Sequence, residues 1–438
     1  MKLISLVYNI AFIPLFSVAV SIMKLFNSKL RQREGDWEDI MESMTRFNER
    51  SEGNNAPRLW FHAASMGEFE QAKPVIENIK RNHPDYIIIV SFFSPSGWVN
   101  QRNYKHADVV LYMPIDKRFN AKYFIREINP SVAVFVRYDI WRNHLEILKK
   151  RNVPTLLVCA TKPGGKFLTT APFLSSFTRS NYNYFDKIIT VGKEHSDFFR
   201  DFGVTSDILT LSDTRFDRII QNVEKAAQSS ILPSSLFSDD ELVLVAGSTW
   251  STDEEIIIEG IKKIEKENIH RVKLIIVPHE PTESNLNRIK KLLPHSFFLS
   301  EIDKFIENES DKDLKSFVSH NHIIVDSIGK LLKLYGHAGA AYIGGAFGTG
   351  VHSVTEPAGY GIPLACGPKY TNSPDASHLV KSGAIRTIND CKDFNKWVID
   401  LIRNNESLAG AGKTAAEYVY SAKGASAVTS SEITKMLP

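Results

Sequence analysis

The strongest hydrophobic signal in the chain is the run Leu3–Phe26, which only Asn9, the serines and Lys24 interrupt. At roughly 20 residues it is about long enough to cross a bilayer as a helix. Pro14 leaves a second mode open, because a helix kinked at this position suits the membrane interface. We therefore expect a membrane anchor over residues 1–27, either spanning or interfacial.

The charges around this run disfavour a cleaved signal peptide, because most of them follow the apolar residues. Lys2 precedes the run, whereas a basic group follows it: Lys24, Lys29, Arg31 and Arg33. By the positive-inside rule, this distribution keeps the rest of the chain on the cytoplasmic side.

Between residues 35 and 228, short apolar runs alternate with helical periods, which is typical of a parallel sheet in an α/β domain. The predicted strands are Arg58–Ala63, Tyr86–Phe93, Val109–Met113, Val132–Val136, Thr155–Cys159 and Lys187–Val191. The predicted helices include Glu68–Arg81, Ala121–Ile128, Asp139–Lys150 and Lys193–Phe202.

A second series covers residues 240–405, after the Ser- and Pro-rich bridge Ser229–Asp240. Its predicted strands are Leu242–Ala246, Lys273–Val277, His322–Val325, Ala340–Ile343, Ile362–Ala365 and Ala384–Thr387, and its helices include Thr252–Glu267 and Ser284–Leu293. The two series predict two Rossmann-like domains facing a cleft. Residues 406–438 are expected to be helical and to pack back on the first domain. Neither first strand is followed by G-x-G-x-x-G, which disfavours a dinucleotide dehydrogenase.

Composition limits the possible partners. The 438 residues include 53 Lys+Arg and 50 Asp+Glu, a net charge of +3, and 43% hydrophobic residues. These averages indicate a globular protein, and without a long Lys/Arg block they predict no nucleic-acid partner. Cys159, Cys366 and Cys391 lie far apart and suit reduced thiols in the cytoplasm. Because no His/Cys/Asp set has metal spacing, we expect no metal and no cofactor.

The first candidate site is the segment His62–Glu68 (HAASMGE), at a strand end that enters a helix. Ligands of open α/β sheets bind at this edge. Gly67 permits close backbone approach, and Glu68 in the first helical turn can act as a general base on a hydroxyl nucleophile. Ser65 and Glu68 also match a helix capping box, which is a structural alternative.

The second candidate is Gly247–Glu255 (GSTWSTDEE), after the first strand of the second domain. The hydroxyls of Ser248 and Thr249, with free N–H groups at a helix start, suit a phosphate. Ser251 and Glu254 match a second capping box, so a structural role stays equally open.

The third candidate is the Gly-rich segment Tyr342–Pro357, which begins with Gly344 and Gly345 at a strand end. Four glycines in seven positions suit backbone donors wrapped around an anion. His352 can donate to such a phosphate, and Glu356 can hold two ribose hydroxyls. The Walker lysine pattern is missing, which excludes a triphosphate P-loop. Ser353 and Glu356 form a third possible capping box, but so many glycines exceed what a cap needs.

Smaller features accompany these sites. His279 lies in a strand-end turn that could contact a nucleotide, and the segment Gly329, Lys330 and Leu331 opens a helix where backbone groups could read a base edge. Arg137, Asp139 and Trp141 follow a strand of the first domain.

Together these segments resemble the 3-deoxy-D-manno-octulosonic acid (Kdo) transferases of lipid A assembly. The likeness is carried by HAASMGE, GSTWSTDEE, VPHEP (Val277–Pro281), GKLLKLYGHAGAAYIGG (Gly329–Gly345) and HSVTEPAGYGIPLACGP (His352–Pro368). The resemblance implies a GT-B glycosyltransferase fold and an inverting transfer of Kdo from CMP-Kdo to a lipid A precursor. It also implies attachment to the cytoplasmic face of the inner membrane of Gram-negative bacteria.

The resemblance further implies roles for single residues. Glu68 matches the proposed general base of the family, with Ser65, Gly67 and Asp139 as acceptor-side candidates. The CMP part of the donor is assigned to Ser248, Thr249, His279, Gly329, Lys330, Leu331, Gly344, Gly345, His352, Ser353 and Glu356. The expected partners are CMP-Kdo, the lipid A precursor and inner-membrane lipid. Because CMP is a monophosphate leaving group, helix-end donors can stabilise its charge without a divalent ion.

The chain departs from the family pattern at four places. Arg137–Arg142 replaces Glu-x-Glu-Leu-Trp-Pro, Pro278–Pro281 replaces Pro-Arg-His-Pro, Val351–Glu356 replaces Gly-His-Asn-Pro-Leu-Glu, and Cys159–Pro163 replaces Asn-Ala-Arg-Leu-Ser. Two alternatives therefore stay open. One is a GT-B transferase that uses another nucleotide sugar, such as a UDP-hexosamine, and the other is a non-catalytic lipid-binding or scaffold protein with this fold.

Overall fold

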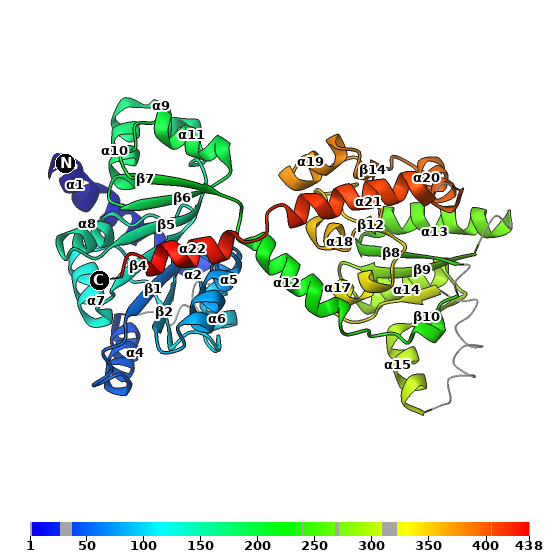
Figure 1. Cartoon of the computed structure of the whole chain (residues 1–438), viewed down its shortest axis with the longest axis horizontal. Helices are drawn as coiled ribbons and strands as arrows, with labels where there is room; N and C mark the ends of the chain where they lie inside the picture. Colours follow the sequence, from blue (N-terminus) through cyan, green and yellow to red (C-terminus); the bar gives the residue numbers. More distant parts are fainter. Residues whose placement is uncertain are drawn as a thin grey trace. The chain divides into compact units, whose positions relative to one another are not determined.

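The computed structural model describes residues 2–26, 37–238, 241–267, 271–308, 322–403 and 405–437. The basic residues Lys29, Arg31 and Arg33 lie outside these ranges. The chain divides into two compact units (Figure 1). The N-terminal domain comprises residues 1–218 and 422–438, and the C-terminal domain comprises residues 219–421.

The N-terminal domain is built on a seven-stranded parallel sheet with the order β3-β2-β1-β4-β5-β6-β7. Its strands are β1 (Arg58–Ala63), β2 (Ile87–Phe92), β3 (Val109–Tyr112), β4 (Val132–Val136), β5 (Thr155–Ala160), β6 (Lys187–Val191) and β7 (Asp207–Leu211). The chain winds outward from β1 to β3 and then in the opposite direction from β4. The carboxyl ends of β1 and β4 therefore form the topological switch point, where such sheets bind ligands.

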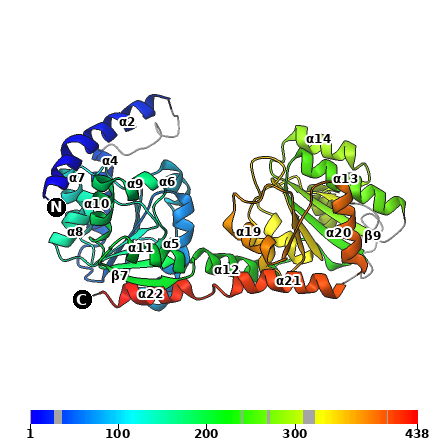
Figure 2. The same ribbon diagram turned by 90° about the horizontal axis from the view of Figure 1, so that it is seen from above.

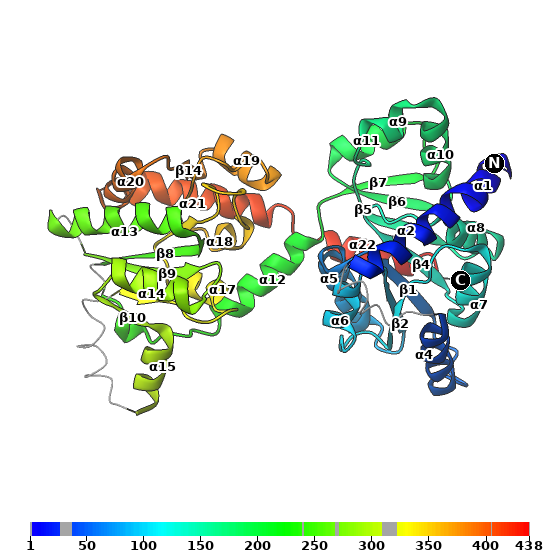
Figure 3. The same ribbon diagram turned by 180° about the vertical axis from the view of Figure 1, so that it is seen from behind.

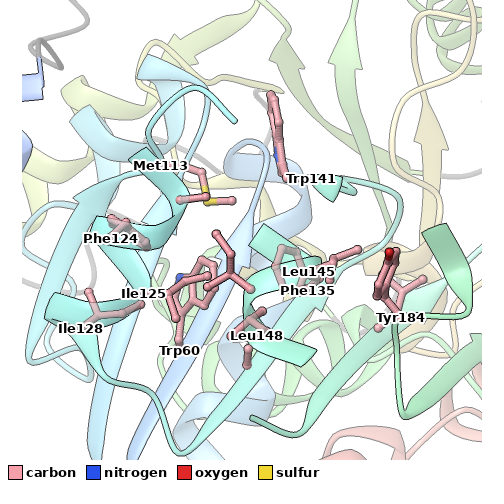
Figure 4. Close-up of a cluster of buried hydrophobic side chains, with 14 of the residues drawn as sticks. Trp60, Met113, Phe124, Ile125, Ile128, Phe135, Trp141, Leu145, Leu148 and Tyr184 are labelled. Atoms are coloured by element: carbon pink, nitrogen blue, oxygen red, sulfur yellow. The ribbon is translucent and has the colours of Figure 1, made fainter. Parts of the chain in front are cut away.

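Helices cover both faces of this sheet because the strand side chains alternate between two apolar cores. Trp60 belongs to one core with Phe124, Phe135 and Leu148, as Figure 4 shows, whereas its neighbour Leu59 belongs to the other. The helices are α4 (Trp37–Arg50), α5 (Met66–Asn82), α6 (Pro95–Gln101), α7 (Arg118–Ile128), α8 (Arg142–Lys150), α9 (Lys166–Thr170), α10 (Pro172–Tyr182), α11 (Lys193–Asp201) and α12 (Arg215–Ala227). The last of these helices continues into the C-terminal domain.

The C-terminal domain repeats the plan with a parallel sheet of order β10-β11-β9-β8-β12-β13-β14. Its strands are β8 (Glu241–Thr249), β9 (Arg271–Pro278), β10 (Ser296–Phe298), β11 (His322–Ile324), β12 (Ala340–Ile343), β13 (Leu364–Cys366) and β14 (Ile385–Thr387). Here β8 and β12 meet at the switch point.

The helices of this domain again flank its sheet. They are η2 (Ser234–Leu236), α13 (Ser251–Lys266), α14 (Glu283–Leu292), α15 (Leu299–Asn308), α17 (Leu331–Leu334), η3 (Tyr335–His337), α18 (Thr355–Gly359), α19 (Pro374–Lys381), α20 (Cys391–Arg403) and α21 (Asn405–Tyr420). Ile257, Ile289 and Trp397 bring α13, α14 and α20 into one apolar core on the sheet.

The final helix α22 (Ala425–Thr434) packs on α5 of the N-terminal domain (Figure 2). Ser430 donates a hydrogen bond to Asn78 of α5 at 2.6 Å. The carboxylate of Asp217 accepts the backbone N–H groups of Gly424 (2.7 Å) and Ser426 (2.6 Å), which satisfies free donors at the helix start.

The N-terminal segment is helical throughout its described part. It consists of α1 (Lys2–Val7), a π-helical turn η1 (Tyr8–Phe12) and α2 (Ile13–Phe26), which lie along the surface of the N-terminal domain (Figure 3). By length and composition, Ser5–Met23 could cross a membrane, which alone is weak evidence of membrane association.

The predicted fold class is confirmed: two Rossmann-like domains of the GT-B type follow an apolar helix. The prediction missed β7 and β10, which are a partly exposed edge strand of one sheet and a three-residue edge strand of the other. The helix expected from Asp139 begins instead at Arg142, since Trp141 has an extended backbone at the N-cap.

Candidate functional site

Glu68 lies at the switch point of the N-terminal domain, in the first turn of α5. One carboxylate oxygen accepts a hydrogen bond from Ser65, and the other accepts one from the Tyr138 hydroxyl at 3.3 Å. The side chains following β1 and β4 thus fix both carboxylate oxygens of Glu68, a residue that is only 7% exposed. The predicted capping box was wrong, because the Ser65 hydroxyl at the N-cap bonds the carboxylate and makes no cap hydrogen bond to the backbone.

His62 connects the acceptor-side candidate Asp139 to the core. Its Nδ1 lies 2.9 Å from the Ser91 hydroxyl, and its Nε2 lies 2.7 Å from an Asp139 oxygen. Trp60 donates its indole N–H to the same hydroxyl at 2.8 Å. Ser91 can therefore direct its own proton to Nδ1, which leaves the His62 proton on Nε2 facing Asp139. This chain of hydrogen bonds orients the Asp139 carboxylate at the switch point.

The ends of β4 and β5 have strained backbones. Arg137 (φ 69°) and Cys159 (φ 53°) both adopt the left-handed region, and the Arg137 N–H donates to Val158 O at 2.8 Å. Non-glycine residues in such conformations cluster at functional sites. Burial raises the pKa of Cys159 to about 12, with a further rise from Asp213, so the thiol is protonated at neutral pH.

In the C-terminal domain, Gly344 at the end of β12 touches the end of β8. A Cβ atom at this position would lie 2.4 Å from the carbonyl oxygen of Ser248, whose own backbone is left-handed (φ 53°). Gly345 also has a positive φ (93°) and donates its N–H to Asp253 at 2.9 Å. Glycine is required where two backbones approach this closely.

Asp253 holds the two loops of this switch point together. Besides Gly345, it accepts the Trp250 N–H at 3.0 Å and the Tyr342 hydroxyl at 2.9 Å. Burial raises the pKa of this carboxyl, whereas these hydrogen bonds lower it. The second predicted capping box was therefore placed one residue late, since the N-cap is Trp250 and the closing carboxylate is Asp253.

Three aromatic rings form a stack beside the Gly-rich loop. His279 lies against Trp250 (ring centroids 4.9 Å apart) and against His352 (4.3 Å). Trp250 also donates its indole N–H to Nε2 of His352 at 3.0 Å. Burial lowers the pKa of His352, and His279 lowers it further while Asp253 opposes the shift. The stack thus brings together His279 and His352, two residues predicted for donor binding.

Thr249 and Ser248 were both predicted to bind the donor, but their side chains lie in different surroundings. Thr249 is buried, and its hydroxyl donates to Glu254 at 2.9 Å. Glu254 in turn pairs with Arg288. Burial raises the pKa of Glu254, whereas Arg288 and Thr249 lower it. In this structure, the Thr249 hydroxyl supports the loop from inside, while Ser248 is partly exposed.

The remaining predicted donor residues flank the same strand ends. Gly329 has a positive φ of 82°, Lys330 is the N-cap of α17, and the Leu331 side chain adjoins Gly247. Glu356 is half-buried, which raises its pKa. Ser353 is exposed and contacts Thr355, so the third capping box was wrong: α18 begins at Thr355, after Val354.

The described residues contain no cluster of three or more His, Cys, Asp or Glu side chains suited to a metal ion. Cys159 and Cys366 are buried, Cys391 is half-buried, and all three are free thiols.

Residues 38–218, which contain Glu68, match the family model described as 3-deoxy-D-manno-octulosonic-acid transferase (kdotransferase). A 3-deoxy-D-manno-octulosonic acid transferase of Chlamydophila psittaci is 28% identical over 75% of this chain and 73% of its own length. The corresponding transferase of Rickettsia felis is 26% identical over 80% and 72%. These matches confirm the predicted resemblance to the Kdo transferase family. The predicted class of enzyme, a glycosyltransferase, is thereby confirmed.

A solved structure supports the fold of this chain. The UDP-GlcNAc 2-epimerase of Neisseria meningitidis has a TM-score of 0.57 and 12% identity, covering 86% of this chain and 100% of its own. At this identity the likeness concerns the fold alone.

Sequence reasoning missed several residues that shape the two sites. Tyr138 bonds Glu68, Trp250 bonds His352, and Asp253 joins the loops. The available signal for Trp250 was its size, since it is the one large aromatic residue in the otherwise small and polar segment Gly247–Glu255.

Proposed function

We propose that this protein is a Kdo transferase that moves Kdo from CMP-Kdo to a lipid A precursor, with inversion at the sugar carbon and Glu68 as general base. The observation that carries the proposal is the placement of Glu68: a buried carboxylate, held at both oxygens by Ser65 and Tyr138, at a sheet edge where ligands bind. It lies within the segment that matches the family.

In the proposed reaction, Glu68 takes the proton of an acceptor glucosamine hydroxyl. The oxygen of that hydroxyl forms a bond to the anomeric carbon of Kdo as the bond from this carbon to the CMP phosphate breaks. The sugar passes through an oxocarbenium-like state, and direct attack from the opposite side inverts the carbon. CMP leaves with the bonding electron pair, and the proton stays on Glu68.

The C-terminal domain would hold the CMP part of the donor. Because Trp250 can only donate, Nε2 of His352 accepts, and the neutral ring carries its proton on Nδ1. This N–H is suited to donate to the departing phosphate, where fixed donors stabilise developing charge. Ser248 and the Gly-rich loop at Gly344 and Gly345 lie at the same edge of the sheet.

We further propose that the enzyme works at the cytoplasmic face of the inner membrane. The apolar run Ser5–Met23 supports membrane attachment, and the lipid acceptor requires access to a bilayer. The basic residues that follow the run support the cytoplasmic orientation.

Mass spectrometry of products formed by the full-length protein with CMP-Kdo and a lipid A precursor tests the proposal. The expected product carries added Kdo, and Glu68→Gln should lower turnover roughly 10²–10⁴-fold with CMP affinity unchanged in calorimetry. Glu70→Gln, two residues along the same helix, is the matched control. Turnover of Glu68→Gln near the wild-type rate would contradict the base assignment, and transfer only from a UDP-sugar would contradict the donor.

A further inference from the structure

The apolar N-terminal helix has a polar face that the N-terminal domain already occupies. The Tyr8 hydroxyl donates to Asp116 at 2.8 Å, and both side chains are buried. The amides of Asn9 and Asn143 exchange two hydrogen bonds, at 3.1 and 2.8 Å. Ser5 bonds the Glu146 carboxylate. Three polar residues of this mainly apolar segment are thus satisfied by partners in the N-terminal domain.

The π-helical turn keeps this docked face continuous. Ile13 follows Tyr8 by five positions, and five residues make about one turn of a π-helix, so both side chains point toward the domain. In an α-helix the same spacing would point Ile13 away from the domain. As a result Tyr8, Ile13 and Val20 are all buried, at 6%, 4% and 5% exposure, and Phe16 packs on the core beside Trp141.

The opposite face of the same helix is an exposed apolar stripe. Its members recur with the same spacing and are 50–71% exposed: Leu6, Ile10, Leu15, Val18 and Ile22. An apolar strip of this length on a protein surface marks an interaction site. One-sided exposure is typical of a helix that lies in a membrane interface, whereas a spanning helix contacts lipid on every side.

A spanning position conflicts with the docked contacts. Crossing the bilayer would strip Tyr8 and Asn9 of their partners and place the Asn9 amide in hydrocarbon, where polar groups without partners are costly. It would also remove one of the hydrogen bonds to buried Asp116, which accepts the backbone N–H groups of Asn143 (2.8 Å) and His144 (3.1 Å) as well.

A basic groove adjoins the stripe at Leu6. It has a volume of about 720 Å³, and its lining includes Arg118, Lys149 and Lys150. Lys149 contacts Asp186 at 2.7 Å, and the Glu146 carboxylate in the lining is engaged by Tyr184 at 3.2 Å. Cations beside an apolar strip are complementary to a bilayer surface with negatively charged headgroups.

We propose that the docked helix is an in-plane membrane-binding element. The apolar stripe enters the acyl region of one leaflet while Arg118, Lys149 and Lys150 bind the phosphates of anionic headgroups. The proposal rests on the membrane attachment proposed above and specifies its mode, but it does not depend on the transfer reaction.

Flotation of the full-length protein with vesicles tests the surface. Binding should be stronger to phosphatidylglycerol-containing vesicles than to pure phosphatidylcholine. Arg118→Ser with Lys150→Ser should weaken that binding roughly fivefold for each removed cation. Leu6→Asp with Ile10→Asp should abolish it, whereas the controls Val99→Asp and Lys413→Ser, exposed elsewhere, should bind like the wild type. Equal binding by the stripe variant and the wild type would overturn the proposal.

A cross-link separates the in-plane from the spanning mode. In a Cys391→Ser background, Asn9→Cys and Asn143→Cys joined by a short bis-maleimide hold the helix on the domain. The in-plane mode predicts undiminished flotation after cross-linking and release by alkaline carbonate. Loss of flotation on cross-linking, or resistance of the wild type to carbonate, would show a spanning anchor and overturn this inference. Membrane attachment would then stand, and Kdo transfer would be judged separately by the product assay.

Discussion

The indole Nε1 of Trp250 donates a hydrogen bond to Nε2 of His352 at 3.0 Å. Since indole has no acceptor, this contact fixes which nitrogen of a neutral His352 carries the proton. The protonated nitrogen is Nδ1, the one left for a ligand. Trp250, which is remote from the Gly-rich loop in sequence, therefore determines which ring nitrogen of His352 can donate a hydrogen bond to a ligand.

Replacing Trp250 separates this hydrogen bond from ring stacking. Trp250→Phe keeps an aromatic ring against His279 but loses the N–H, and should lower kcat/KM for the nucleotide sugar about fivefold, the worth of one hydrogen bond. Trp250→Gln keeps a donor and loses the ring. If the hydrogen bond matters, Gln restores the wild-type pH profile and Phe does not; the reverse order would assign the role to stacking.

The stability of the protein should fall on the acid side of the His352 pKa range. Burial lowers the folded-state pKa of His352 below its ordinary value of 6.5, so the unfolded chain binds more protons as pH falls through 6.5. The contribution of neutral His352 to the free energy of unfolding is fully present above pH 6.5. It is lost as the pH falls through the lowered folded-state pKa. Thermal unfolding between pH 5 and 8 should show a shallower acid loss for His352→Gln than for the wild type, and parallel curves would contradict this.

Gly344 and Gly348 are a matched pair of glycines in one loop. A Cβ at Gly344 meets the backbone at 2.4 Å, whereas a Cβ at Gly348 has only Gly345 O at 3.6 Å. Gly344→Ala should destabilise the protein by about 1–3 kcal/mol and weaken CMP binding, because β8 and β12 must separate. Gly348→Ala should be nearly neutral. Chemical denaturation and calorimetry with CMP measure both, and equal effects would contradict the close approach of the two strand ends.

Tyr138 should act through Glu68. Tyr138→Phe removes the 3.3 Å hydrogen bond to the carboxylate and should reduce kcat about fivefold, with KM for the donor unchanged. Ser65→Ala with Tyr138→Phe frees both oxygens and should cost more than either change alone. A donor KM that rises in step with the loss of kcat would instead indicate a general disturbance of the fold.

Local patterns were enough to predict all but one strand of each sheet, because buried parallel strands are continuous apolar runs: β4, β6 and β12 have the predicted bounds. They were not enough for the capping residues. Ser65, Ser251 and Ser353 fit the same sequence rule, yet each hydroxyl's partner depends on three-dimensional neighbours. For the same reason, Tyr138 was not predicted as a partner of Glu68, since 70 residues separate them.

Because of the π-helical turn at Tyr8–Phe12, the N-terminal helix can accept substitutions between aliphatic residues but not an inserted residue. Exchanging one aliphatic residue for another on the stripe leaves both faces intact. Inserting a single residue within the turn would rotate every later side chain by about 100°, because a π-helical turn already holds one residue more than an α-helical turn. Ile13 and Val20 would then leave the core, and the stripe would no longer face the lipid. Homologous anchors should therefore vary freely in sequence and hardly at all in spacing between the tyrosine and the first buried isoleucine.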